Sequence, residues 1–177
     1  MSTIEQTRAL PTGTWKADPV HSEIGFGIDY MAGTFRGTFS RFSAEVADGR
    51  LTGSADVASV HVKDPSLETH LQSPEFFDAE RHPQLTFASR EVERTGDEVT
   101  VRGEITIKGR TEPVELRGTI TDPFADPYGN ERFGLHLRTT VDRTAFGIDW
   151  NAPLPTGQPA LANEVELVAD LQLVQAA

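Results

Sequence analysis

The sequence predicts an all-β protein, a closed barrel or a sandwich of about eight antiparallel strands. Residues 99–107 carry the clearest signal, because apolar residues or Gly at odd positions alternate with Thr, Arg or Glu at even positions. This alternation is typical of a strand with one buried and one wet face. Turn residues separate such segments, and signals for helices are few. The alternating or β-rich segments are 24–28, 35–39, 57–62, 85–92, 99–107, 114–120, 133–141 and 165–173.

The first three of these segments are short and rich in Phe, Ile and Val. Residues 24–28 and 35–39 place a large apolar side chain at alternate positions, and 57–62 contains three Val. Gly27 and Gly37 fall inside the first two segments. Glycine within a strand marks a bend or a place where another group approaches the backbone closely. We therefore expect local bends or close contacts in this part of the barrel.

A short helix is expected after these segments, from Pro65 to Leu71. Asp64 has the side chain of a good N-cap, and proline is well suited to the first helical position. Pro74 cannot continue a helix, so the helix should end before it.

The chain between Pro74 and Pro83 interrupts the strand pattern. Both prolines lack an amide donor and fix φ, so neither fits a central strand or a helix interior. Phe76 and Phe77 lie between them. Because two adjacent Phe need an apolar surface to cover, we expect this excursion to fold over one end of the barrel.

The second half of the chain is predicted to form β-hairpins. Residues 85–92 and 99–107 are followed by 114–120, and Gly109 with Pro113 supplies the turn before the last of these. Residues 133–141 and 165–173 each show a further row of alternating apolar side chains. An antiparallel meander of this kind closes readily into a barrel.

Composition limits the partners of the protein. The chain of 177 residues has 27 acidic and 16 basic residues, a formal net charge of −11. This balance argues against nucleic acid or an anionic membrane surface as a partner, since both attract clustered Lys and Arg. Cysteine is absent, which excludes disulfides and thiolate chemistry. No segment approaches the roughly 20 apolar residues of a membrane span.

Length predicts one domain, at residues 13–177, after a flexible leader at residues 1–12. The leader contains Glu5 and Arg8 and no apolar run, so it does not resemble a signal peptide. We therefore expect a cytoplasmic protein.

Residues that could carry catalysis are sparse. The five His are scattered and have no Cys or paired His nearby, so no metal site is expected. No Gly-x-Ser-x-Gly elbow is present to expose a nucleophilic serine. Asp78 and Glu80 stand two residues apart, close to His82, and paired carboxylates can act in hydrolysis. In so acidic a protein such a pair is expected by chance, so we predict no catalytic residues, no metal and no cofactor.

The aromatic content points to the barrel interior. Ten Phe and two Trp are more than a small closed barrel needs, although aromatic side chains also dominate ordinary β cores. An eight-stranded barrel can be filled by side chains or can hold one ligand, and composition does not choose between these. Residues 26–30, Phe-Gly-Ile-Asp-Tyr, are echoed at 146–150, Phe-Gly-Ile-Asp-Trp. The echo fits two similar strand edges or a shared pocket rim.

Four motifs in order resemble the YceI-like polyisoprenoid-binding proteins. The first is Trp15-Lys-Ala-Asp-Pro-Val-His-Ser-Glu-Ile-Gly-Phe26, and the second runs from His70 through Phe76-Phe77-Asp78 to His82-Pro83 and Phe87. The third is the hairpin Gly103-Glu-Ile-Thr-Ile-Lys-Gly-Arg-Thr111, and the last is Arg143-Thr-Ala-Phe-Gly-Ile148. Each motif alone is weak, but the resemblance covers about residues 14–174.

This resemblance implies an eight-stranded antiparallel lipocalin-like barrel with a helical excursion between strands. It also implies a long apolar cavity that binds a polyisoprenoid or isoprenoid quinone-like lipid for storage or transport, a possible homodimer, and no catalysis. The alternatives are a hydrolase or isomerase that uses Asp78, Glu80 or His82 at the barrel mouth, and a stress-response interaction module with a filled core. The expected ligand-binding residues are Phe26, Ile28, Phe35, Phe39, Phe76, Phe77, Phe87, Leu137, Phe146 and Trp150.

Overall fold

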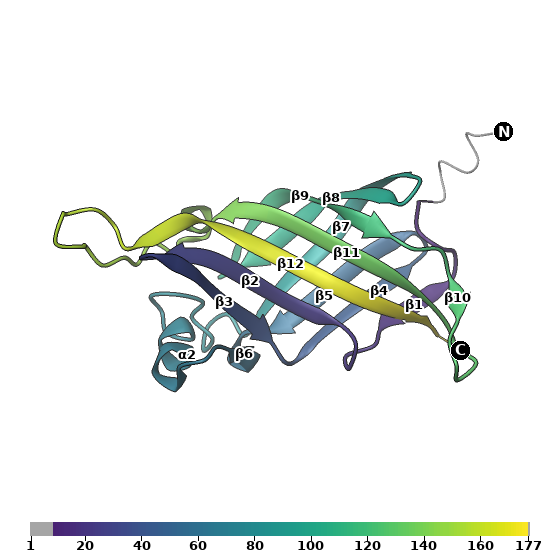
Figure 1. Cartoon of the computed structure of the whole chain (residues 1–177), viewed down its shortest axis with the longest axis horizontal. Coiled ribbons are helices and arrows are strands. Elements are labelled where there is room, and N and C mark those ends of the chain that lie inside the picture. The colour runs from purple at the N-terminus through teal and green to yellow at the C-terminus, as the bar shows by residue number, and fades with distance from the viewer. Residues whose placement is uncertain (1–8, 177) are drawn as a thin grey trace.

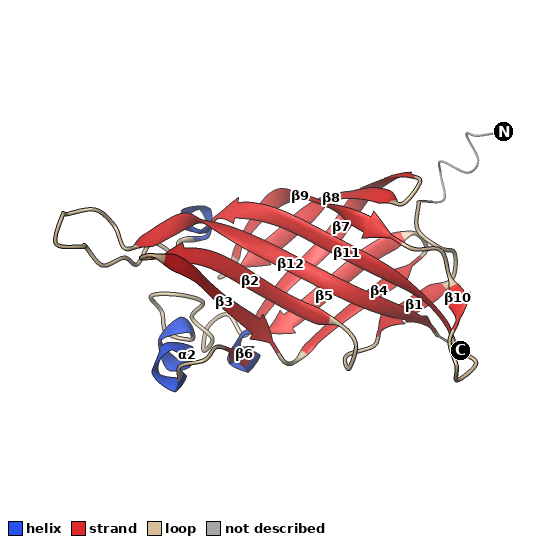
Figure 2. Cartoon of the chain, viewed as in Figure 1, coloured by secondary structure: helices blue, strands red, loops and turns tan. Residues whose placement is uncertain are grey.

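The structure is a computed structural model that describes residues 9–176, and its main body is an elongated barrel of oblique strands (Figures 1 and 2). Within this range the chain forms strands, one short α-helix and two 3-10 turns. The strands are β1 (Thr14–Ala17), β2 (Glu23–Tyr30), β3 (Gly33–Phe39), β4 (Phe42–Ala47), β5 (Arg50–Asp56), β6 (Val60–His61), β7 (Gln84–Thr95), β8 (Glu98–Ile107), β9 (Arg110–Ile120), β10 (Phe124–Ala125), β11 (Glu131–Asp142) and β12 (Leu161–Gln175). The helix is α2 (Pro65–Leu71), and the 3-10 turns are η1 (Val57–Ser59) and η2 (Arg143–Phe146).

The long strand β12 closes the barrel. One of its edges pairs with β11 along most of its length, from Asp142↔Glu164 to Arg132↔Val174. Its other edge pairs first with β2 and then with β1, which follow one another along the same side. The closed ring therefore runs β12, β1, β4, β5, β7, β8, β9, β11 and back to β12. This confirms the predicted eight-stranded antiparallel barrel.

Three of the eight strands are broken into two parts. β1 and β2 together form the first of these strands, β3 and β4 the second, and β5 and β6 the third. The two parts of each strand occupy the same place in the order of strands around the barrel. The predicted strand at 57–62 is wrong over Val57–Ser59, which form η1 instead. The Ser59 hydroxyl donates to the Asp56 carbonyl at 2.7 Å and accepts from the Arg41 amide at 3.0 Å, which stabilises this turn.

The alternation predicted for residues 99–107 is confirmed in β8. Its odd positions are buried, with Val99 3% and Val101 0% exposed, whereas its even positions are partly exposed. β9 pairs with all of β8 but with β11 only over Arg117–Ile120. Within residues 9–176, the first half of β9 therefore has one edge without a strand partner, and Pro113, which has no amide to donate, lies in this half.

The core has two halves along the barrel. The half near the two termini contains a cluster of buried aliphatic and aromatic side chains around Trp15 and Phe133, whose rings meet edge to face at 5.0 Å. The half near α2 is lined mainly by a second cluster, which includes Phe26, Phe39 and Phe146. Figure 1 shows α2 at the end of the barrel remote from both termini.

The predicted helix is confirmed as α2. The Asp64 carboxylate accepts from the Ser66 amide at 2.9 Å, and Pro65 opens the helix. At the other end of the barrel, Ala9 and Leu10 are buried and Leu10 joins the core, so the expected flexible leader does not extend over these two residues. The rest of that segment, residues 1–8, lies outside the described residues. No helix within residues 9–176 is long and apolar enough to cross a bilayer.

Candidate ligand cavity

The α2 half of the barrel contains a cavity of about 490 Å³ that is partly open to the outside. This volume lies within the roughly 300–1,000 Å³ typical of small-molecule sites. Side chains from strands all around the ring line it, together with α2, η2 and the segments that follow them. The alternative of an entirely filled core is therefore wrong for this half of the barrel. All ten residues expected to bind ligand line the cavity: Phe26, Ile28, Phe35, Phe39, Phe76, Phe77, Phe87, Leu137, Phe146 and Trp150.

The floor of the cavity is aliphatic. Leu51, Leu137 and Leu171 line it and also belong to the packed half of the core. A hydrocarbon tail that reaches this depth meets no charged side chain of the floor. The floor therefore suits the end of an apolar chain.

Phe26 on β2 is the centre of the aromatic wall. Its ring lies 5.9 Å from that of Phe39, 6.1 Å from that of Phe77 and 6.4 Å from that of Phe35, measured between centroids. The ring can sit there because Gly37 has no side chain: a Cβ at that position would lie 2.6 Å from the ring of Phe26. The close approach expected at a strand glycine is thus present at Gly37.

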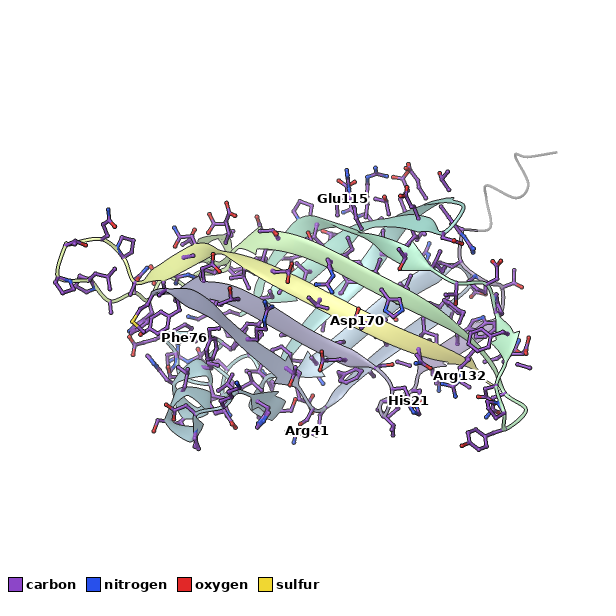
Figure 3. The ribbon with its side chains drawn as sticks, in the orientation of Figure 1. His21, Arg41, Phe76, Glu115, Arg132 and Asp170 are labelled. Atoms are coloured by element: carbon purple, nitrogen blue, oxygen red, sulfur yellow. The ribbon has the colours of Figure 1, made fainter. Side chains whose placement is uncertain are left out.

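The excursion covers the α2 end of the barrel, where Phe76 is labelled in Figure 3. The ring of His70 meets those of Phe76 and Trp150 edge to face, with centroids 4.8 and 5.0 Å apart. Lys108 holds the excursion from outside, because its ammonium donates to the Pro74 carbonyl at 2.5 Å. The covering segment is therefore tied both to the loop after η2 and to the β8–β9 turn.

Arg143, at the start of η2, is the cationic side chain of the cavity wall. It is 4% exposed. Its Nε donates to the Ala162 carbonyl at 2.8 Å, and its Nη1 donates to the carbonyls of Ile148 and Trp150 at 2.9 and 2.8 Å. Burial lowers the pKa of this guanidinium, and the negative charges of Asp149 and Asp142 oppose that shift.

Sequence reasoning placed Arg143 in a family motif but gave it no role at the site. A lone Arg before an apolar-Gly-apolar run is a weak signal, because its burial depends on how the chain after β11 folds back. His70 and Tyr30 also line the cavity without having been expected there. The inward residues Ile105 and Ile107 of β8 line it as well, although only their burial was predicted.

The two echoed segments line the same cavity. Residues 26, 28 and 30 of the first segment and 146, 148 and 150 of the second all contribute to its wall. The first segment lies in β2, whereas the second forms the end of η2 and the loop after it, so they are not two strand edges. The shared pocket rim is the interpretation that agrees with the structure.

The residues considered for catalysis lie away from the cavity wall. Among the described residues that form the wall, Asp78, Glu80 and His82 do not appear. Asp78 is buried with φ of 54°, and its amide donates to the Ser73 carbonyl at 2.9 Å, so it shapes the excursion. His82 lies against Gly109. Within residues 9–176 no group of three His, Asp or Glu could hold a metal ion.

Comparison with known proteins identifies relatives of this barrel. The family model of the YceI-like domain matches residues 15–173. A UPF0312 protein of Pectobacterium atrosepticum is 33% identical over 136 residues, which cover 72% of this chain and 71% of that protein. The crystal structure of BcnA from Burkholderia cenocepacia has a TM-score of 0.74 and 26% identity, covering 90% of this chain and 99% of that one. A polyisoprenoid binding domain from Saccharophagus degradans shares the fold, with a TM-score of 0.68 at 10% identity over 94% of this chain and 100% of that domain.

Proposed function

Because this chain belongs to the family of YceI-like domains, we propose that its barrel binds one long apolar amphiphile, of the polyisoprenoid or isoprenoid quinone type, for storage or transport. The observation that carries the proposal is the cavity of about 490 Å³, which has an aliphatic floor and an aromatic wall. The domain from Saccharophagus degradans that has the same fold is a polyisoprenoid binding domain, which adds support for a polyisoprenoid as the ligand.

The energetics of the cavity suit an apolar ligand. Burial of about 400 Å² of hydrocarbon gains on the order of 10 kcal/mol at roughly 25 cal/mol per Å², before the costs of association. Hydrophobic burial is non-directional and discriminates only weakly between similar ligands, because one methylene contributes only about 1 kcal/mol. Selection by chain length would follow from the depth of the cavity.

The proposal is one of binding without chemical conversion. The alternative of a hydrolase or isomerase depends on Asp78, Glu80 or His82 at the mouth, and none of these is among the residues of the cavity wall. A binding role requires only the apolar surface that the barrel presents.

Native mass spectrometry of the purified protein, followed by organic extraction, tests the proposal. We expect a mass above that of the chain of 177 residues and an extracted lipid with a long apolar tail. Leu167→Trp, which fills the cavity, should reduce the extracted lipid, whereas the matched control Glu166→Trp on the same strand should not, because Glu166 is not part of the wall. Equal lipid content in both variants, or no lipid uptake when isoprenoids are supplied, would overturn the proposal.

A further inference from the structure

One nitrogen of the Arg143 guanidinium, Nη2, makes no hydrogen bond to the described residues. A guanidinium carries five N–H donors. Nε and Nη1 use three of these on the carbonyls of Ala162, Ile148 and Trp150. Among residues 9–176, Nη2 makes no hydrogen bond, and no fully buried side-chain nitrogen is without a partner. Nη2 therefore keeps some accessible surface, in a side chain that is 96% buried and belongs to the cavity wall.

The positive charge of Arg143 is also without a direct counter-ion. Asp142 and Asp149 are near enough to act on its pKa, but no salt bridge within 4.0 Å joins Arg143 to a described carboxylate. The carboxylate of Asp142 instead accepts from the amide and hydroxyl of Thr144. A buried charge is costly unless a partner neutralises it. The cavity thus has a place for one negative group.

Arg143 and His70 lie toward the α2 end of the cavity, where Asp64 and Ser66 also line the wall. Arg143 is bonded to the Trp150 carbonyl, and the Trp150 ring is 5.0 Å from that of His70. Leu137 and Leu171 form the floor away from this end. An amphiphile therefore fits in one direction, with its head at the α2 end and its tail on the floor.

We propose that Nη2 of Arg143 donates hydrogen bonds to an anionic oxygen head, a carboxylate or a phosphate, of the amphiphile bound in this cavity. The inference rests on the proposed function and narrows its ligand from a long apolar amphiphile with any head group to one whose head group is anionic. Charge-assisted hydrogen bonds to a guanidinium are roughly twice as strong as neutral ones, and the two N–H groups of Nη2 can donate to the oxygens of a carboxylate or a phosphate.

Four probes with one shared tail test the inference: tetradecanoic acid, tetradecyl phosphate, tetradecanol and tetradecylamine. Calorimetric titration of delipidated protein should show one or both anions bound roughly tenfold more tightly than the alcohol, with the amine weakest. Preference for the carboxylate or for the phosphate identifies the head. Equal binding of acid, phosphate and alcohol overturns the inference but leaves the proposed function standing. Failure of all four probes and of isoprenoid alcohols to bind overturns both.

The pKa of the bound tetradecanoic acid tests the inference in the unmodified protein. With its carboxyl carbon isotopically labelled, its titration can be followed by NMR. A carboxylate beside Arg143 should have a pKa below its value in water, whereas one surrounded by hydrocarbon alone should have a raised pKa. A raised pKa overturns the inference.

Substitution of Arg143 provides a further test of the inference. Arg143→Met should bring the acid-to-alcohol affinity ratio close to one, whereas Arg110→Met should keep it, because Arg110 is exposed beside Gly147 and is not part of the wall. A ratio that stays near ten in Arg143→Met contradicts the inference. If that variant does not fold, the NMR titration of the unmodified protein decides.

Discussion

The imidazole of His70 and the indole of Trp150 meet edge to face with their centroids 5.0 Å apart. His70 comes from α2, and Trp150 follows η2, so the contact joins two segments that are distant in the chain. Phe76 contacts both rings, at 4.8 and 5.4 Å. All three residues line the cavity, so their rings join α2, the excursion and the loop after η2 in its wall.

Removal of the two covering Phe should loosen this part of the wall. The double variant Phe76→Ser, Phe77→Ser removes the contacts of Phe76 with His70 and Trp150 and of Phe77 with Phe26 and Phe39. We expect ligand release to become about tenfold faster, which corresponds to roughly 1.4 kcal/mol. Release can be followed by transfer of a fluorescent lipid to acceptor vesicles. Phe124→Ser, at an exposed position of β10, is the control. Unchanged release together with a collapsed fold would show that Phe76 and Phe77 act as core and not as a cover.

The two faces of β8 should respond differently to charge. Val101 is fully buried, so Val101→Asp places an unpaired carboxylate in the core and should lower the free energy of unfolding by roughly 3 kcal/mol or more. Thr106→Asp loses the contact with the Thr111 hydroxyl at 2.7 Å but faces water, and should cost about 1 kcal/mol or less. Denaturant unfolding compares the two. Equal losses would contradict the assignment of the strand faces.

Gly118 is required where β9 and β11 pair. A Cβ at this position would lie 1.6 Å from the backbone carbonyl oxygen of His136, which belongs to the facing strand. Gly118→Ala should therefore push the strands apart and cost roughly 1–3 kcal/mol. Gly33→Ala is the matched control, because no atom lies within 4 Å of a Cβ there. Thermal unfolding measures both, and a cost at Gly33 as large as at Gly118 would refute the steric explanation.

Stability should depend on pH through Arg132. Its guanidinium lies 2.7 Å from the Asp126 carboxylate and 3.3 Å from that of Asp18 at the end of the barrel where Figure 3 labels His21 and Arg132. The hydrogen bond from His21, with others from the Val20 amide and Arg132, holds the pKa of Asp18 below its usual value. The amide of Asn130, with Arg132 and the Tyr128 amide, does the same for Asp126.

These lowered pKa values determine the sign of the effect. A carboxylate with a lower pKa in the folded state stabilises the protein above its unfolded pKa of about 3.9, and this stabilisation is lost as the pH falls through the folded pKa. Arg132→Met should therefore be less stable than the unmodified protein at pH 7, and the difference should shrink below about pH 4. Urea unfolding across pH measures it, with Arg117→Met as the exposed control. A difference that is constant with pH would contradict the electrostatic origin.

The strand pattern is local, and for this reason the sequence alone predicted most of the barrel. One segment was recognised in each of the eight strands, and the inward face of β8 and the capped helix α2 were predicted in detail. The other parts of the three broken strands, β1, β4 and β5, were missed. In β5, Leu51 and Ala55 are the apolar inward residues and a Gly lies between them, so the alternation is faint. In β1, four residues are too few to show a period.

By itself, the sequence determined the all-β class, the faces of the strands and the aromatic residues that turn inward, because alternation and turn chemistry act between near neighbours. Only the tertiary structure decided that the core divides into two clusters and that the cavity lies mainly within the one near α2. That division depends on the sum of side-chain volumes from eight strands and on where β9 and β11 separate. It also decided the position of Arg143, since three carbonyls from the chain after β11 bring its guanidinium into the wall. A charge becomes buried through contacts distant in the chain, and no local pattern encodes them.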